Sequence, residues 1–287
     1  MLAILYGLLT GFCFASAALY TQKGLHDFPT PWGAWITLVV NSLFLWVFHL
    51  PLHPEAPILI TDNLPFVVIG LFVPGISRLL AFRGIRNMGS SVTATVLNST
   101  PLFSTTLAVA FLGERPGFLV VFGIGSIMGG LIVISWEGGK GKWSRIEILY
   151  PLLAAFLFGA KDVMARWGMA ATGQPILAAA IATTTATVEV TLITRFLHGE
   201  KFILPSLGKS LWYIIAGFFT GGAFLFMFLA LHMERVTIIS PLMSSYAVFV
   251  LLLTPLVAGK IEVITPRKVA GALLVVVGVI FLSLGRN

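Results

Sequence analysis

Cysteine, clustered histidine and charge are what this sequence has least of. Cys13 is the only cysteine among 287 residues, which excludes an intrachain disulfide and a thiolate metal site. The five histidines are scattered without the spacing of metal ligands, so no metal site is expected. Charged residues make up 10% of the chain, against about 25% in an average soluble domain. This composition excludes a water-soluble protein of the ordinary kind.

Catalytic and nucleotide-binding motifs are also missing. The sequence has no Walker A loop, no nucleophile elbow, no H-E-x-x-H pair and no pair of opposed membrane aspartates. We therefore expect no catalytic residue and no cofactor. The net charge of +7 comes from basic residues that lie mostly between apolar runs, where they orient helices against anionic lipid. Because no basic patch is interleaved with aromatic residues, nucleic acid is not an expected partner.

Long apolar runs are what the sequence has in abundance. Hydrophobic residues make up 57% of the chain and the mean hydropathy is +0.98. About twenty apolar residues in a helix cross the hydrocarbon core of a bilayer. The first run lacks a basic n-region and a small-residue cleavage site, so we expect it to be retained. The sequence predicts an all-α integral membrane protein with ten transmembrane helices, at residues 2–22, 30–50, 64–86, 90–113, 117–136, 148–168, 175–196, 210–232, 236–259 and 265–284.

The second half of the chain repeats the first. Glu114-x8-Gly123-x6-Gly130 returns as Glu262-x8-Gly271-x6-Gly278, and residues 6–14 match residues 150–158 at an offset of 144. We therefore expect one compact membrane domain built from two units, residues 1–139 and 140–287. Five spans per unit is an odd number, so the two units must lie in opposite orientations. Inverted repeats are typical of alternating-access transporters.

Three pairs of glycines have the small-xxx-small spacing that lets membrane helices approach closely. We expect helix contacts at all three: Gly7/Gly11, Gly125/Gly129 and Gly217/Gly221.

The chain resembles the drug/metabolite transporter superfamily, in its ten-span branch of EamA-like permeases. The polar run from Ser90 to Thr100, followed by Pro101 and by Leu112-Gly113-Glu114, carries the resemblance. The second copy is looser: it has Pro241, Gly259 and Glu262, but Phe249 stands where a proline would be expected. The resemblance implies a basket of ten helices around a central cavity, with the third, fourth, eighth and ninth spans near its middle.

Four charged residues lie in the interiors of predicted spans, away from the span ends: Arg78, Lys161, Asp162 and Glu189. A charge at this depth costs about 2.5–3.5 kcal/mol on insertion scales and often marks function. Asp162 has Arg166 one turn further along the same helix face, and we expect these two to form a structural pair. Glu189 has no such local partner. It either forms a salt bridge with Arg78 or Lys161 that holds the bundle together, or it is a carboxylate whose proton occupancy alternates with substrate.

Candidate substrate contacts follow from possible interruptions in the third and eighth spans. Pro74-Gly75 and Gly221-Gly222 occupy corresponding places and are the candidate helix breaks. Arg78 follows the first pair, whereas Phe224 follows the second, an asymmetry that suits a ligand with an anionic end and an apolar body. The alternative for Arg78 is snorkelling to the membrane surface. Asn98 and Tyr246, in the fourth and ninth spans, are the leading neutral candidates, and helix bridging is their alternative role.

Lysine and arginine concentrate on one membrane face, which we call side A; side B is the face that bears both termini. The positive-inside rule places side A in the cytoplasm, whereas the family resemblance implies the reverse.

The leading functional hypothesis is a secondary transporter that exports small metabolites, amino-acid-like or amphipathic compounds, with protons as a possible second partner through Glu189. The alternative is a flippase for lipids or lipid carriers. The expected location is the plasma (inner) membrane, and the sequence carries no signal for an oligomeric state.

Overall fold

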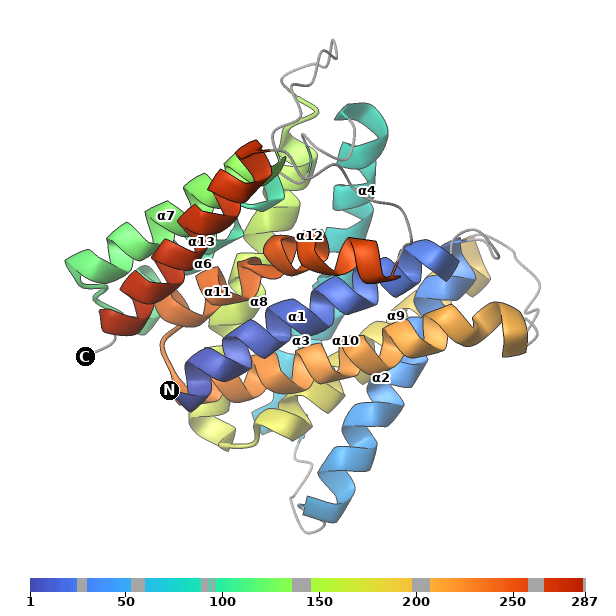
Figure 1. Cartoon of the computed structure of the whole chain (residues 1–287). Helices are drawn as coiled ribbons and strands as arrows, with labels where there is room; N and C mark the ends of the chain where they lie inside the picture. Colours follow the sequence, from blue (N-terminus) through green and yellow to red (C-terminus); the bar gives the residue numbers. More distant parts are fainter. Residues whose placement is uncertain are drawn as a thin grey trace.

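The computed structural model describes residues 1–24, 30–52, 60–88, 93, 96–135, 146–197, 207–257 and 266–285. Helices account for nearly all of these residues, as the apolar runs predict, and each of the ten predicted spans coincides with one or more helices (Figure 1). The elements are α1 (Leu2–Gly24), α2 (Thr30–Leu52), α3 (Ile60–Gly70), the π-helical segment η1 (Leu71–Ile76), α4 (Ser77–Met88), α6 (Thr100–Leu112), α7 (Phe118–Ser135), α8 (Leu149–Thr172), α9 (Pro175–Leu197), α10 (Leu207–Met233), α11 (Val236–Ser244), α12 (Tyr246–Val257) and α13 (Pro266–Leu284).

Helix length and outer surface both fit a membrane. Among the described residues, five stretches are long and apolar enough to cross a bilayer: Leu2–Gly24, Trp32–Pro51, Pro175–Ile193, Ser210–Met233 and Val236–Thr254. Large apolar side chains also cover the outside, as lipid contact requires; Phe111, Phe118 and Leu256 are all more than three-quarters exposed. The chain is a multi-pass membrane protein. The expected unit boundary at residues 139–140 lies outside the described residues.

The interface between α7 and α13 shows how the two repeats are related. A Cβ built on Gly130 would lie 2.5 Å from the Gly271 carbonyl oxygen, and one on Gly271 would lie 2.7 Å from the Gly130 oxygen. Gly123 and Gly278 face each other in the same reciprocal way. The earlier glycine of one helix therefore meets the later glycine of the other, so the fifth and tenth spans run antiparallel, side by side in Figure 1. This confirms the predicted inversion of the repeats.

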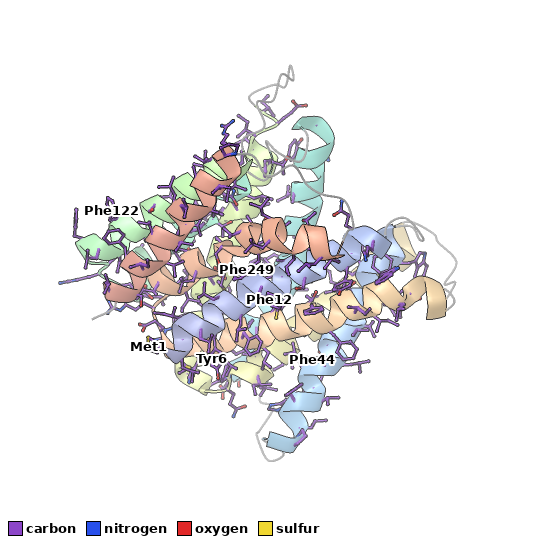
Figure 2. The ribbon with its side chains drawn as sticks, viewed as in Figure 1. Met1, Tyr6, Phe12, Phe44, Phe122 and Phe249 are labelled. Atoms are coloured by element: carbon purple, nitrogen blue, oxygen red, sulfur yellow. The ribbon has the colours of Figure 1, made fainter. Side chains whose placement is uncertain are left out.

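The small-xxx-small spacing predicted helix contacts correctly at two of three places. Gly7 and Gly11 let α1 approach the ninth span, and Gly217 and Gly221 let α10 approach α2, where Gly221 makes room for the Phe44 ring labelled in Figure 2. The prediction for Gly125/Gly129 was wrong. A Cβ on either would meet no atom of the described residues within 4 Å, because this face of α7 turns away from α13.

The third and eighth spans differ in their continuity. In the third span, α3 gives way to η1, where Val73 has extended dihedral angles (φ −132°, ψ 120°) next to Pro74-Gly75. Proline removes a backbone donor and clashes with the preceding turn, which accounts for the interruption. The eighth span does not break: α10 runs uninterrupted through Gly221 and Gly222. The predicted second helix break was therefore wrong, because these glycines serve close packing and keep helical geometry.

The fourth and ninth spans share an interruption that the apolar pattern does not reveal. Ser99 (φ −78°, ψ −4°) precedes α6, and Ser245 (φ −62°, ψ −4°) separates α11 from α12. Each serine hydroxyl donates to the carbonyl three residues earlier, Val96 and Leu242 respectively, at 2.6 Å in both. The backbone N–H groups of the same serines donate to the same carbonyls. In each span, one serine therefore makes local bonds in place of the regular helical ladder.

Candidate functional site

Glu189 on α9 faces the interruption of the third span. A Cβ built on Gly75 would collide with the Glu189 carboxylate and would lie 2.6 Å from its Cδ, so only a glycine lets this carboxylate approach η1. Oε2 of Glu189 is buried, and no described group forms a hydrogen bond with it. A buried carboxylate oxygen without a donor is costly as an anion. The Glu189 carboxylate is therefore suited to bind a proton, a cationic ligand or a ligand that donates a hydrogen bond.

Arg78 lies in the first turn of α4, directly after η1. The structure thus places its backbone near the same interruption as Glu189. Its side chain lies outside the described residues, as does that of Pro74, so the Arg78–Glu189 pair stays a prediction.

Lys161 and Asp162 form an ion pair near the middle of α8. Lys161 Nζ lies 2.7 Å from Asp162 Oδ1, and the two side chains are 8% and 3% exposed. The ammonium also donates to the Met227 thioether on α10 at 2.9 Å, although sulfur is a weak acceptor. The proposed alternative that Lys161 neutralises Glu189 was wrong, because its nearby carboxylate is Asp162.

The predicted pair between Asp162 and Arg166 was also wrong. Arg166 instead donates to the carbonyl oxygens of Leu231, at 2.7 Å, and of His232. These carbonyls end α10, where the helix dipole and the lack of intrahelical donors favour a cation. Arg166 thus caps α10, and Asp162 pairs with the residue beside it.

Phe224 is buried in a chain of aromatic rings. Its ring centroid lies 6.0 Å from Phe14 on α1 and 6.3 Å from Phe228, which in turn lies 6.3 Å from Phe66 on α3. Phe224 and Met227 are three residues apart on α10, and Lys161 of α8 contacts Met227, so the aromatic chain lies beside the Lys161–Asp162 pair. An ionic group next to aromatic faces is the combination that an amphipathic ligand needs.

The two neutral candidates take different positions. Asn98 is buried and its amide donates to the Leu131 carbonyl of α7 at 3.3 Å, so it bridges the fourth and fifth spans. Tyr246 is half-buried and begins α12 directly after Ser245, where its backbone nitrogen lies against Gly11. Neither position tests a role in substrate binding, which stays a prediction for both.

A polar contact between α2 and α9 went unnoticed at the sequence level. The Trp46 indole donates to the Thr184 hydroxyl at 2.9 Å, and Ser42 shares the same hydroxyl at 2.8 Å. Trp46 falls well inside the second span, away from an interfacial belt, and this depth was the available signal. Asn41 beside it is fully buried, and no described group forms a hydrogen bond with its amide.

Metal ligation finds no support among the described residues, where no three histidine, cysteine, aspartate or glutamate side chains group together.

Comparison with known proteins places the chain in a family. The EamA-like transporter family matches residues 1–136 and again residues 145–284. A solved structure, described only as the crystal structure of a protein, superposes with a TM-score of 0.80 and 18% sequence identity, over 99% of this chain and 97% of that one. At this identity it shows the fold alone. No curated protein matches. The family match covers nearly the whole chain as two repeats, so the chain belongs to the EamA-like transporter family.

Proposed function

We propose that this transporter exports small amino-acid-like or amphipathic metabolites by alternating access, with a proton carried on Glu189. The location that we propose is the plasma (inner) membrane. The observation that carries the proposal is the Glu189 carboxylate against Gly75, inside the interruption of the third span. Interrupted helices in transporters expose backbone groups and bind substrates and coupling ions near the midplane.

Proton coupling follows from the surroundings of this carboxylate. Glu189 is costly to ionise because a buried oxygen lacks a described donor. Protonation removes that cost, whereas an approaching cation or hydrogen-bond donor of the substrate stabilises the anion. Proton and substrate then compete for one group, which is the requirement for exchange between them.

The substrate class follows from the groups around the middle of the bundle. Lys161 supplies a cation, Glu189 and Asp162 supply anions, and the Phe14–Phe224–Phe228 rings supply an apolar wall. Arg78, whose role stays a prediction from the sequence, would supply a second cation. A substrate with a carboxylate, an amine and an apolar body would use all three. We expect Arg78→Ala to weaken carboxylate-bearing substrates more than neutral ones, and equal losses would make this arginine structural.

The deciding experiment uses Glu189→Gln in proteoliposomes. We expect substrate-driven proton movement to vanish while substrate–substrate exchange continues, because the amide keeps the shape of the side chain but cannot carry the proton. Asp62→Asn, at an exposed carboxylate near the start of α3, is the matched control. An unchanged ratio of protons to substrate in Glu189→Gln would refute Glu189 as the proton carrier. Movement of labelled lipid in the same liposomes, without metabolite flux, would favour the flippase.

A further inference from the structure

Glu114 joins the two repeats through its carboxylate. Oε1 accepts a hydrogen bond from the Val236 backbone N–H at 2.8 Å, and Oε2 accepts one from Thr237 at 3.0 Å. Glu114 belongs to the first repeat, directly after Gly113, whose left-handed backbone (φ 66°) ends α6. Val236 and Thr237 are the first two residues of α11 in the second repeat. One side chain therefore caps a helix that lies 122 residues further along the chain.

The start of α11 has no cap of its own. Its N-cap residue is Arg235, whose side chain makes no capping bond, and its first turn contains no acidic residue. A helix N-terminus leaves backbone N–H groups unsatisfied and carries a partial positive charge, so a carboxylate there is strongly favoured. Glu114, which belongs to the first repeat, supplies the acceptor oxygens for the Val236 and Thr237 N–H groups that the Arg235 side chain does not supply.

The two halves of the ninth span share α1 as a neighbour but differ in their contact with α6. α11 packs against α6 and α1, with smaller contacts to α7 and α8, whereas α12, beyond Ser245, packs mainly against α1. Figure 1 shows the change of direction between α11 and α12, and Figure 2 shows Phe249 of α12 near Phe12 of α1, with centroids 5.9 Å apart. The Glu114 contact lies at the other end of α11, on side B, where α6 ends and α11 begins. Ser245 is thus a joint between a half-helix that contacts α6 as well as α1 and a half-helix that contacts mainly α1.

We propose that Glu114 is a positioning residue of the transport cycle, which latches the side-B ends of the fourth and ninth spans together. Release of the two backbone N–H groups lets α11 move about Ser245 and opens side B. The state described here is the latched one. This inference rests on the alternating-access function proposed above, and it adds the residue that holds one side closed.

A labelling experiment tests the latch. Ser240→Cys places a thiol one turn into α11 at a position that is 1% exposed, in a background in which Cys13 is replaced by alanine. In vesicles of known orientation, we expect Glu114→Ala to raise labelling by a membrane-impermeant maleimide from side B about tenfold, the shift that loss of one helix cap produces. Labelling from side A should not rise. Glu114→Gln keeps one acceptor oxygen, so it should lie between the two.

Glu234→Ala is the matched control, because Glu234 accepts the Arg235 backbone N–H at 3.2 Å within the second repeat. It should leave labelling of Ser240→Cys unchanged. Equal increases from both sides in Glu114→Ala, or no increase in a folded Glu114→Gln, would show that Glu114 is only a structural cap and would overturn the proposal. The labelling experiment needs neither a substrate nor a proton gradient. It therefore tests the latch even if Glu189 does not couple transport to protons.

Discussion

The Glu189 carboxylate occupies the space that a side chain at Gly75 would fill. This relationship joins the seventh span to the interruption of the third, and it pairs a titratable group with the least regular backbone among the described helices. A substitution at either residue should therefore alter the surroundings of the other. The glycine supplies room and the glutamate supplies charge, so the two contributions can be separated by substitution.

Gly75→Ala should abolish coupled transport while leaving the protein folded. The added Cβ meets the end of a flexible side chain, which can rotate away at little cost. Glu189 would then lose its place beside η1. We expect transport to fall at least tenfold with little change in Tm, measured by flux in proteoliposomes and by thermal unfolding in detergent.

Gly70→Ala is the packing control for that experiment. A Cβ there would meet the Ala182 backbone oxygen and lie 2.6 Å from Thr185 Cβ, and a backbone atom cannot rotate away. This variant should lower Tm, whereas Gly75→Ala should not. If Gly75→Ala transported normally, the position of the carboxylate beside η1 would have no part in the cycle.

The Lys161–Asp162 pair should stabilise the fold only as a pair. Both side chains are more than nine-tenths buried, so removing one partner leaves an uncompensated charge. Lys161→Met and Asp162→Leu should each lower the free energy of unfolding by about 3–5 kcal/mol. The double variant replaces the pair by apolar groups and should recover most of that loss. Denaturant unfolding checks this, and a double variant as unstable as either single one would contradict a buried pair. A stable double variant that no longer transports would assign the pair to substrate binding.

Most of the fold could be predicted, because it is determined by the lengths of the apolar runs and by the internal repeat. Ten apolar runs give ten spans, and the shared spacing of Glu114, Gly123 and Gly130 with their second copies gives the inversion. The joint at Ser245 could not be predicted. It is one residue with a local hydrogen bond, inside a run that stays uncharged on both sides. Hydropathy responds to burial in lipid and not to the direction of the helix axis.

The contacts of the candidate site were harder to predict, because charged side chains also bind donors or acceptors that other helices supply. The i, i+4 rule assigned Asp162 to Arg166, but the open carbonyls at the end of α10 bind Arg166 more favourably. Lys161 and Asp162 are adjacent, and only the long lysine side chain lets neighbours on a helix meet. Glu114 was visible only as a marker of the repeat, since its partners lie in the other half of the chain.

The contact between α7 and α13 offers a test in which two kinds of glycine on one helix behave oppositely. A Cβ at Gly130 would lie 2.5 Å from the Gly271 oxygen and 2.9 Å from the Val275 nitrogen, so Gly130→Ala must push two backbones apart. We expect it to lower the free energy of unfolding by about 1–3 kcal/mol, the usual cost of overpacking. The added Cβ in Gly125→Ala and Gly129→Ala meets no described atom within 4 Å, so both variants should be neutral, or stabilising by about 0.5–1 kcal/mol through helix propensity. Thermal unfolding of the three variants in one detergent compares them directly. Equal destabilisation by all three would mean that α7 turns a different face to α13, and the reciprocal glycine contact that shows the inversion would be lost with it.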